Sequence, residues 1–575
     1  MESISELNEH KKMTTNGAVD HLILILNLSH YQDDRTSLLK NLAYYTPRIR
    51  SKVQLKRLIN SIIESHIWLP QNENGVLSLF ELTEAIFHWK LEISEPVISI
   101  RDFYDIWDSG FRRCHSWTTP KLALLCGVLS TESKFERLQS TLFIDDSGSV
   151  HFKYREWRSN LLLPIFSELF HASHNSQSLN EMCLIYAPLC REGDIKHIPN
   201  SAVTRCLFNL STEFMLGKDQ KNSFLARHIN SIANALHLLL TWTEHEVVTQ
   251  VLKVICSLSF ELSIKELNNP KKDYSVKPYS DVLLTIVLIL QGCASRLDLP
   301  YEWAYEIVIS LFYINYLVHD FGVVGFSNYE HIHDVSIAGV TITSSGFYNV
   351  LSVMRGNLWS LSGNKVNDSR VLFVLTFLEQ TLAKIPIDSD KLKNIVAPLI
   401  SHYLDFPNGE ILETAHSAYL ALFTNRISMQ PMDQWKFEHA IQYIDQSTMQ
   451  FMQKILSSSQ LVLIYRTVAS QLPYLKYIND DLGRQLLQYT YLKILNCKTL
   501  DEKSTLIECL ICQVMYTDER FLRDWLDNCL ELLSTCQGRK KELLDKLWKT
   551  IMSSGQNEAA LDWWYSVAMP LQCNL

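Results

Sequence analysis

The sequence predicts an all-α protein, built as an irregular α-solenoid in which helical hairpins of the HEAT or armadillo kind stack side by side. Glycine (18) and proline (16) are scarce among the 575 residues, whereas sheets and barrels need both residues for their frequent turns. One compact core is excluded at this length, because single cores stop growing at roughly 250–300 residues. Helices that pack only on their neighbours satisfy both observations. No repeat period indicates a regular tetratricopeptide or ankyrin array.

The first part of the chain is predicted to be a flexible N-terminus over 1–17 and a helical region over 18–267. The acidic, polar start is unlike a secretory signal or transit peptide. In the helical region, apolar residues recur three or four apart and so share one helix face, as do Leu225, Ile229, Ile232, Leu236 and Leu239. Helix starts are predicted where the spacing of a capping box occurs: Thr243 with Glu246, Ser99 with Asp102, Ser133 with Glu136, and Thr499 with Glu502.

A polar, proline-bounded loop over 268–278 is expected to precede a C-terminal helical region over 279–568. Within that region, 321–347 breaks the helical pattern, since it holds Gly322, Gly325, Gly339 and Gly346 and the β-prone residues 340–343. We therefore predict an irregular insertion with a short hairpin there. Pro570 is expected to end the last helix, because its ring excludes an internal hydrogen bond. This leaves 569–575 as a free tail.

Charge and composition exclude several functions. The net charge of −9 and the pI of about 6.1 provide no basic footprint for nucleic acid. Thirteen cysteines follow no framework, which indicates small buried side chains in a protein made in a reducing compartment. The longest apolar run, Val282 to Leu290, falls short of the roughly 20 residues of a membrane-spanning helix. A soluble or peripheral protein is therefore predicted.

One stretch is a candidate metal or catalytic site: His319, Asp320, His331, His333 and Asp334. Histidines two apart on a strand face the same way and can bind a metal beside a carboxylate. The alternative interpretation is a polar surface loop. His171 and His174 are either a ligand pair or side chains near the free carbonyls of a helix end. No phosphate loop, nucleophile elbow or zinc-protease motif occurs. We therefore predict no enzyme, no cofactor, no metal and no small-molecule substrate.

Two further motifs carry alternatives. Cys509 and Cys512 form a C-x-x-C without a second pair or a βαβ context, so we interpret them as buried core. The Trp563-Trp564-Tyr565 run is either an exposed anchor for a partner or a group that packs on the preceding helix.

The last three residues, Cys573, Asn574 and Leu575, have the general form of the peroxisomal address, which is a small residue, a polar residue and leucine. A receptor that captures the α-carboxylate buries the leucine and has room only for a small side chain two places earlier. Asn574 departs from the usual basic residue and loses a charge contact. We predict that these three residues bind the import receptor.

Three blocks in the N-terminal third carry a family resemblance: 44–48 with Ser51, 89–96 with Phe103, Tyr104 and Trp107, and 143–147 with Tyr154, Arg155 and Trp157. Their order and spacing resemble the fungal peroxin-8 family over residues 40–170. The resemblance implies a peripheral protein on the lumenal face of the peroxisomal membrane. It also implies a scaffold that bridges the docking and RING-finger complexes of matrix-protein import and engages the import receptor in cargo release. The alternatives are a cytosolic or nuclear helical adaptor with a coincidental tail, and an enzyme using 319–334.

Overall fold

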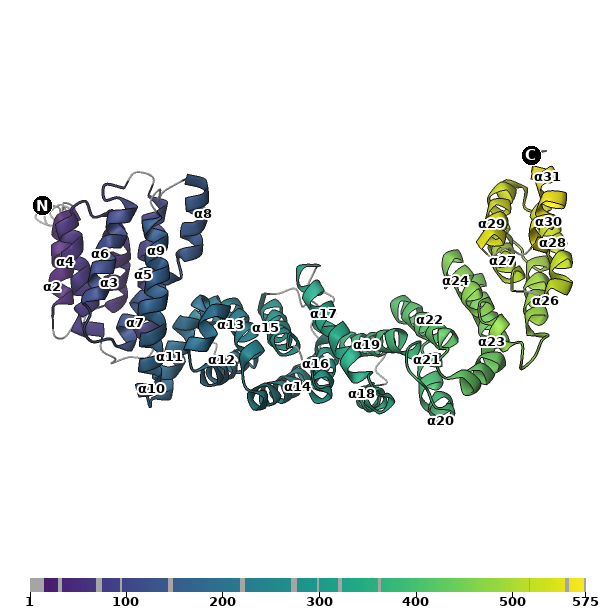
Figure 1. Cartoon of the computed structure of the whole chain (residues 1–575), viewed down its shortest axis with the longest axis horizontal. Helices are drawn as coiled ribbons and strands as arrows, with labels where there is room; N and C mark the ends of the chain where they lie inside the picture. The colour runs from purple at the N-terminus through teal and green to yellow at the C-terminus, as the bar shows by residue number, and fades with distance from the viewer. Residues whose placement is uncertain are drawn as a thin grey trace, which may run out of the picture. The chain divides into compact units, whose positions relative to one another are not determined.

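The computed structural model describes residues 15–28, 34–68, 75–93, 96–142, 148–217, 223–269, 277–296, 299–318, 323–359, 363–516, 518–553 and 558–572 (Figure 1). These residues form helices and turns without any strand, which confirms the all-α prediction. The chain divides into two compact units, residues 1–336 and 337–575. The predicted regions 18–267 and 279–568, and the flexible N-terminus over 1–17, stay predictions.

Unit 1 is a stack of helical hairpins. Its main helices are α2 (Thr15–Leu26), α3 (Arg35–Tyr45), α4 (Lys52–Glu64), α5 (Gly75–Glu92), α6 (Ile100–Arg113), α7 (Thr119–Leu129), α8 (Glu132–Leu142), α9 (Ser149–Glu156), α10 (Leu163–Ala172), α11 (Ser176–Tyr186), α12 (Asn200–Met215), α13 (Ser223–Trp242), α14 (His245–Asn268), α15 (Lys277–Ala294), α16 (Tyr301–Val318) and α17 (Val323–Val340), which carries the division between the units. Helices α2, α4, α6 and α9 lie in one layer and α3, α5 and α7 in a second (Figure 1). Further along, α13 packs on α15, and α14 packs on α12 and α16.

Some of the residues that carry the family resemblance form an aromatic core between α5, α6, α9 and the start of η4 (Trp157–Leu162). Tyr104, Trp107, Tyr154 and Trp157 are fully buried there. The ring of Phe87 lies 4.9 Å from that of Tyr104 in an edge-to-face contact, and Trp157 stacks on Tyr104 at 6.1 Å between ring centroids. Contacts of this kind add to the hydrophobic gain of burying large rings. The blocks therefore hold the first helices of unit 1 together.

A chain of hydroxyl groups crosses this core. The Thr131 hydroxyl donates to the Val128 carbonyl at 2.7 Å, so it can only accept from the Tyr154 hydroxyl, 2.9 Å away. Tyr154 is then left to accept from Tyr104 at 2.8 Å. Burial raises the pKa of both phenols. The order Tyr104, Tyr154, Thr131, Val128 gives each of the three buried hydroxyl groups an acceptor.

A buried ion-pair network connects the later helices of unit 1. The Arg158 guanidinium contacts Asp194 at 2.6 Å and the Leu189 carbonyl at 2.8 Å. Glu132 lies 3.7 Å from Arg158 and pairs with Arg191 at 2.6 Å. Because Arg158, Glu132 and Asp194 are all buried, removing one partner leaves a charge without compensation.

Two glycines set the closest helix contacts of unit 1. A Cβ at Gly127 would lie 2.1 Å from the backbone carbonyl oxygen of Phe80, so the backbones of α7 and α5 lie in close contact at this point. A Cβ at Gly292 would lie 2.5 Å from the carbonyl oxygen of His237, where α15 meets α13. Only glycine leaves room for these approaches, because any Cβ would collide with backbone atoms.

Within the described part of the chain, α14 is the one helix whose length and hydropathy would let it cross a membrane. Its buried residues, which include Val247, Val251 and Ile255, belong to the core that α14 forms with α16. We therefore assign α14 to the interior of unit 1. The predicted capping box at Thr243 is wrong, because Thr243 donates to the Leu239 carbonyl at the end of α13 and Glu244 is the N-cap of α14.

Unit 2 continues the hairpin architecture. Its helices are α18 (Ser344–Gly356), α19 (Lys365–Leu382), α20 (Ser389–Lys391), α21 (Ala397–Ser401), α22 (Gly409–Thr424), α23 (Met429–Met452), α24 (Ser458–Ala469), α25 (Leu472–Leu475), α26 (Leu482–Leu495), α27 (Leu500–Val514), α28 (Glu519–Ser534), α29 (Lys540–Ser553), α30 (Glu558–Trp563) and α31 (Met569–Gln572). Helices α19, α22, α24, α27 and α29 pack in succession, and α21, α23, α26 and α28 pair with them.

A buried histidine fixes α22 against α23. His416 Nδ1 lies 2.9 Å from the Tyr443 hydroxyl, and its Nε2 lies 3.0 Å from the side-chain oxygen of Gln450. A neutral ring satisfies both contacts, with Nε2 donating and Nδ1 accepting. Burial lowers the pKa of His416 to about 4.

The predicted irregular insertion with a hairpin at 321–347 is wrong over its described residues. Residues 323–340 form α17, and α18 starts at Ser344. Ile332, Ile337 and Val340 are buried on α17, so helical spacing of apolar residues outweighs the β propensity of 340–343. Thr343 is the N-cap of α18 and accepts from the backbone N–H of Gly346. Thr343, the last residue of the β-prone series, is therefore accounted for as the residue that caps α18.

Each π segment of the described chain ends two residues before a proline. These segments are η4 (Trp157–Leu162), η7 (Leu392–Val396) and η9 (Trp564–Ala568), followed by Pro164, Pro398 and Pro570. A proline has no N–H and its ring crowds the preceding turn, and a widened π turn relieves both problems. The expected end of the last helix at Pro570 is therefore wrong, since α31 continues through Gln572.

Of the three other predicted helix starts, two are confirmed and one is wrong. Ser99 and Thr499 are N-caps, and Thr499 forms the complete reciprocal box with Glu502. The start at Ser133 is wrong, because α8 begins at Glu132.

Candidate functional site

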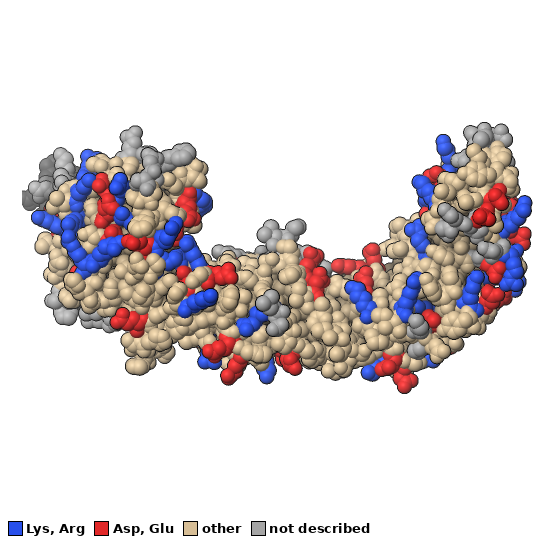
Figure 2. Space-filling view, in the orientation of Figure 1, with Lys and Arg blue, Asp and Glu red and all other residues tan. Residues whose placement is uncertain are grey.

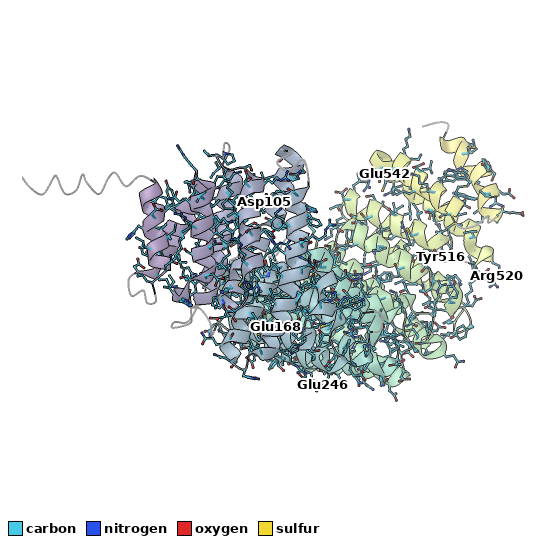
Figure 3. All side chains as sticks on the ribbon, turned by 60° about the vertical axis from the view of Figure 1, so that its left-hand side comes forward. Asp105, Glu168, Glu246, Tyr516, Arg520 and Glu542 are labelled. Atoms are coloured by element: carbon cyan, nitrogen blue, oxygen red, sulfur yellow. The ribbon has the colours of Figure 1, made fainter. Side chains whose placement is uncertain are left out.

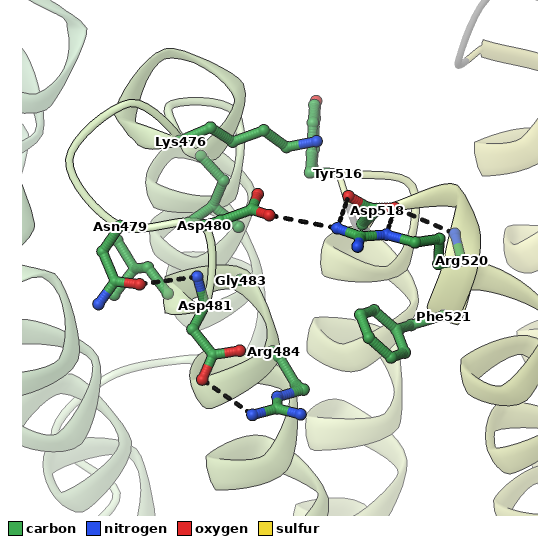
Figure 4. Close-up of a pocket in the computed structure, with 12 residues that line it drawn as sticks. Lys476, Asn479, Asp480, Asp481, Gly483, Arg484, Tyr516, Asp518, Arg520 and Phe521 are labelled. Carbon is green, nitrogen blue, oxygen red and sulfur yellow. Dashed lines mark hydrogen bonds and ion pairs between the residues drawn. The ribbon is translucent and has the colours of Figure 1, made fainter.

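A pocket of about 280 Å³ lies in unit 2 between two helix corners (Figure 4). One corner joins α25 to α26, and the other joins α27 to α28. Asp481 is the N-cap of α26, and its backbone N–H donates to the side chain of Asn479 at 2.8 Å. Asp518 is the N-cap of α28 and accepts from the backbone N–H of Arg520 at 3.0 Å. Side-chain capping therefore holds Asp518 at this edge, whereas the Asp481 side chain makes no capping hydrogen bond.

Ion pairs bridge the two corners. Arg520 Nη2 lies 3.2 Å from Asp480 on one corner and 2.9 Å from Asp518 on the other (Figure 4). The hydrogen bond from the Arg520 side chain lowers the pKa of the Asp518 carboxyl well below its usual range. Arg484 pairs with Asp481 at 2.9 Å. Tyr516 and Arg520 lie close together at the α27–α28 corner (Figure 3).

The lining balances three cations against three carboxylates over apolar and aromatic side chains. The lining residues are Leu472, Lys476, Asn479, Asp480, Asp481, Leu482, Gly483, Arg484, Tyr516, Asp518, Arg520 and Phe521. The pocket's described lining includes no histidine, cysteine, serine or threonine, and its three carboxylates are engaged in ion pairs with Arg484 or Arg520. Its mixture of donors, acceptors and rings suits recognition of a peptide segment. We missed this pocket in the sequence because its two corners are 40 residues apart; the one local signal is the Asn479-Asp480-Asp481 run between helices.

The predicted targeting residues Cys573, Asn574 and Leu575 lie outside the described residues, as do His319 and Asp320 of the candidate metal site. The rest of that site lies on α17, where His331 is exposed and His333 is 7% exposed. Residues two apart on a helix point to different sides, so the strand geometry behind this candidate is wrong. Among the residues that the structure describes, no three His, Cys, Asp or Glu side chains converge on a metal position.

The other candidates are structural. Cys509 and Cys512 are buried in α27, and burial raises the pKa of both thiols, which confirms the core interpretation. Trp563 and Trp564 are buried as well. Trp563 Nε1 donates to Asp527 at 2.7 Å, and Trp564 lies 4.9 Å from Trp548 between ring centroids.

The remaining side chains of these motifs face solvent. Tyr565 is 57% exposed, so of the aromatic run only this ring is available to a partner. His171 lies in the last turn of α10, and both it and His174 are exposed.

Comparison with known proteins identifies relatives over most of the chain. Residues 347–424 match the family model of the PEX8 central TPR-like domain, and residues 434–570, which include the pocket, match that of the PEX8 C-terminal domain. The chain is 28% identical to Peroxisomal biogenesis factor 8 of Saccharomyces cerevisiae, covering 92% of this chain and 94% of the relative. It is 22% identical to Peroxisomal biogenesis factor 8 of Pichia angusta, covering 92% and 90%.

Solved structures with a similar course include crystal structures of Kap121p. A multiply substituted Kap121p has a TM-score of 0.39 at 12% identity, with 96% of this chain and 56% of that chain covered. Kap121p bound to Pho4p has a TM-score of 0.38 at 12% identity, with 95% and 57% covered. The chain thus spans little more than half the length of these proteins. The two domain matches and the two relatives agree with the resemblance of the N-terminal blocks, and they confirm that the chain resembles the fungal peroxin-8 family of peroxisome biogenesis proteins.

Proposed function

We propose that the chain is an intraperoxisomal scaffold that links the docking and RING-finger subcomplexes of matrix-protein import and engages the import receptor for cargo release. The observation that carries this proposal is the match to Peroxisomal biogenesis factor 8 over 92% of the chain. The blocks at 40–170 and the address-like tail support the same assignment.

The proposed mode of action is binding rather than catalysis. The pocket in unit 2 presents ion-paired charges and aromatic rings, which favours a peptide partner. Proteins built of stacked helical repeats bind partners over extended surfaces, and the pocket lies on the solvent-exposed corners of this stack. We propose that the partners are the import receptor and the docking and RING-finger peroxins, and that the protein is peripheral on the lumenal face of the membrane.

An affinity experiment tests the partners. An N-terminally tagged chain is purified from gently solubilised peroxisomal membranes, and the co-purifying proteins are identified by mass spectrometry. We expect docking and RING-finger peroxins together with the import receptor. A variant with Arg520→Ala and Arg484→Ala tests the pocket, and the matched control changes Lys253 and Lys498, which are exposed lysines elsewhere. Retrieval of no import component by the unchanged chain contradicts the scaffold.

Imaging tests the tail. With a fluorescent protein at the N-terminus, removal of residues 573–575 should leave the chain outside peroxisomes. Asn574→Lys should strengthen import, because it supplies the basic side chain of the usual address. Normal import of the tail-less chain without an assisting partner would show that the address lies elsewhere. Diffuse fluorescence of the complete chain in cells with healthy peroxisomes would favour the cytosolic or nuclear adaptor.

A further inference from the structure

The surface around the α3–α4 and α5–α6 corners of unit 1 differs in charge from the chain as a whole. Residues 35–57 contain seven basic residues and no acidic one: Arg35, Lys40, Arg48, Arg50, Lys52, Lys56 and Arg57. Because the chain has a net charge of −9, the rest of it carries −9 − 7 = −16. Figure 2 shows several Lys and Arg side chains over the N-terminal helices, with Asp and Glu side chains among them. Residues 35–57 can therefore attract anions, although the net charge of the whole chain is negative.

Most of these cations are available. Lys40, Arg50, Lys56 and Arg57 are exposed. None of these four has an ion-pair partner among the residues that the structure describes. Lys52 is paired with Asp102 at 2.8 Å, which neutralises the nearest carboxylate on α6. Salt bridges within the protein therefore do not account for the basic run.

Exposed aromatic rings lie beside these charges. Tyr44 is 54% exposed and Trp89 46% exposed. The Arg48 guanidinium lies between them, 4.2 Å from the Tyr44 ring and 5.1 Å from the Trp89 ring, and it donates to the Tyr44 carbonyl at 2.6 Å. This stack ties the end of α3 to the end of α5. The stack holds two large amphipathic side chains, Tyr44 and Trp89, on the surface. Because they are about half exposed, a role in the core does not account for their presence.

Two protruding valines complete the surface. Val53 at the start of α4 is 64% exposed, and Val97 in the α5–α6 corner is 69% exposed. The corner that carries Val97 is anchored by the buried Lys90, whose Nζ donates to the Ile98 carbonyl at 2.6 Å. We give the name N-terminal edge to the exposed or half-buried residues of these helices and corners: Lys40, Tyr44, Arg48, Arg50, Val53, Lys56, Arg57, Trp89 and Val97.

We propose that the N-terminal edge docks directly on an anionic phospholipid surface. Tyrosine and tryptophan favour the boundary between headgroups and acyl chains, because one side of each ring is apolar and the other end is polar. Exposed valines at convex corners can enter the same layer, and nearby Lys and Arg attract acidic headgroups. An acidic protein segment would use the charges but would gain little from valines that protrude rather than line a pocket. The proposal deepens the peripheral membrane location above and rests on it.

Vesicle co-sedimentation of the full chain tests this. We expect binding to phosphatidylcholine vesicles that contain phosphatidylserine, weak binding without it, and release by salt. Arg50→Ala, Lys56→Ala and Arg57→Ala together should weaken binding on the order of 100-fold, since each Lys or Arg near an anionic surface contributes about fivefold. Trp89→Ser should weaken binding to vesicles separately. The matched control replaces Lys253, Lys498 and Lys541, which are also exposed, so both triple variants have the same net charge.

Several results would overturn the proposal. These are failure of the unchanged chain to bind acidic vesicles, an equal loss in the control triple variant, or retention on immobilised polyglutamate that needs the three cations but not Trp89. The last result would assign the edge to an acidic protein. The circular dichroism melting curve of each variant reports whether it is folded. A chain that retrieves import peroxins but binds no vesicle contradicts this inference alone, and one that binds vesicles but retrieves no peroxin contradicts the scaffold alone.

Discussion

The hydroxyl chain in the aromatic core predicts unequal effects for two chemically identical substitutions. Tyr154→Phe removes the middle hydroxyl and leaves the buried Tyr104 donor without an acceptor. Leaving a buried donor unsatisfied costs about 1–3 kcal/mol, so we expect a loss of about 2 kcal/mol. Tyr104→Phe removes only the terminal donor, and Tyr154 still donates to Thr131. One lost hydrogen bond costs about 1 kcal/mol.

The double variant sharpens the test. With both phenol hydroxyls gone, Thr131 still donates to the Val128 carbonyl, and no hydroxyl of the chain is left without an acceptor. We therefore expect the double variant to cost about 1 kcal/mol, below the sum of the two single losses. A coupling of about 2 kcal/mol is typical of residues that share one hydrogen-bond network. A double variant with this small loss of stability would also show that the two phenyl rings still fit the core.

Local hydrogen exchange is the suitable measurement, because a chain of two units need not unfold in one step. Peptides from α6 and α9 report the free energy of local opening. For Tyr154→Phe they should exchange roughly 30-fold faster, which corresponds to about 2 kcal/mol. Equal losses for the two single variants, or a double variant that costs their sum, would refute the assigned direction of the hydroxyl chain.

Three further predictions follow from other buried groups. The pKa of His416 is about 4 in the folded chain and ordinarily about 6.5. The free energy of unfolding around α22 should therefore be highest above pH 6.5 and fall by about 3 kcal/mol as the pH drops towards 4. His416→Asn should flatten this pH dependence in urea melts. Gly127→Ala should cost about 1–3 kcal/mol by forcing α5 and α7 apart, whereas Gly409→Ala, whose Cβ meets nothing within 4 Å, should leave the melting temperature unchanged. Arg158→Met should cost about 3–5 kcal/mol by leaving Asp194 buried and unpaired, and adding Asp194→Asn should recover part of that loss in the same thermal melts.

The helices could be predicted from sequence because their signals are local. The apolar spacing between Leu225 and Leu239 corresponds to α13, and the Thr499 box forms as expected. The secondary-structure predictions fail where contacts with residues distant in the sequence determine the conformation. Residues 323–340 form α17 because their apolar positions are buried in the fold, which β propensity at 340–343 does not reveal. Pro570 does not end its helix, because η9 widens the preceding turn.

The candidate binding surfaces were harder to predict for a related reason. The pocket combines corners at 476–484 and 516–521, and only the stacking of α26 on α27 brings them together. The N-terminal edge was concealed by averaging, since a net charge of −9 over 575 residues says nothing about a run of seven cations. A charge count by segment would have found that run. The exposure of Tyr44 and Trp89 could come only from the structure.

The blocks that resemble the peroxin-8 family contain two kinds of residue, and the structure separates them. Tyr104 and Tyr154 are fully buried and cannot touch a partner, whereas Tyr44 and Trp89 are about half exposed. Substitutions of the buried pair should therefore change local opening and leave vesicle binding intact wherever the chain stays folded. Substitution of Trp89 should do the reverse. If Tyr154→Phe abolished vesicle binding without loosening α6, the separation of fold-maintaining from surface residues within these blocks would be wrong.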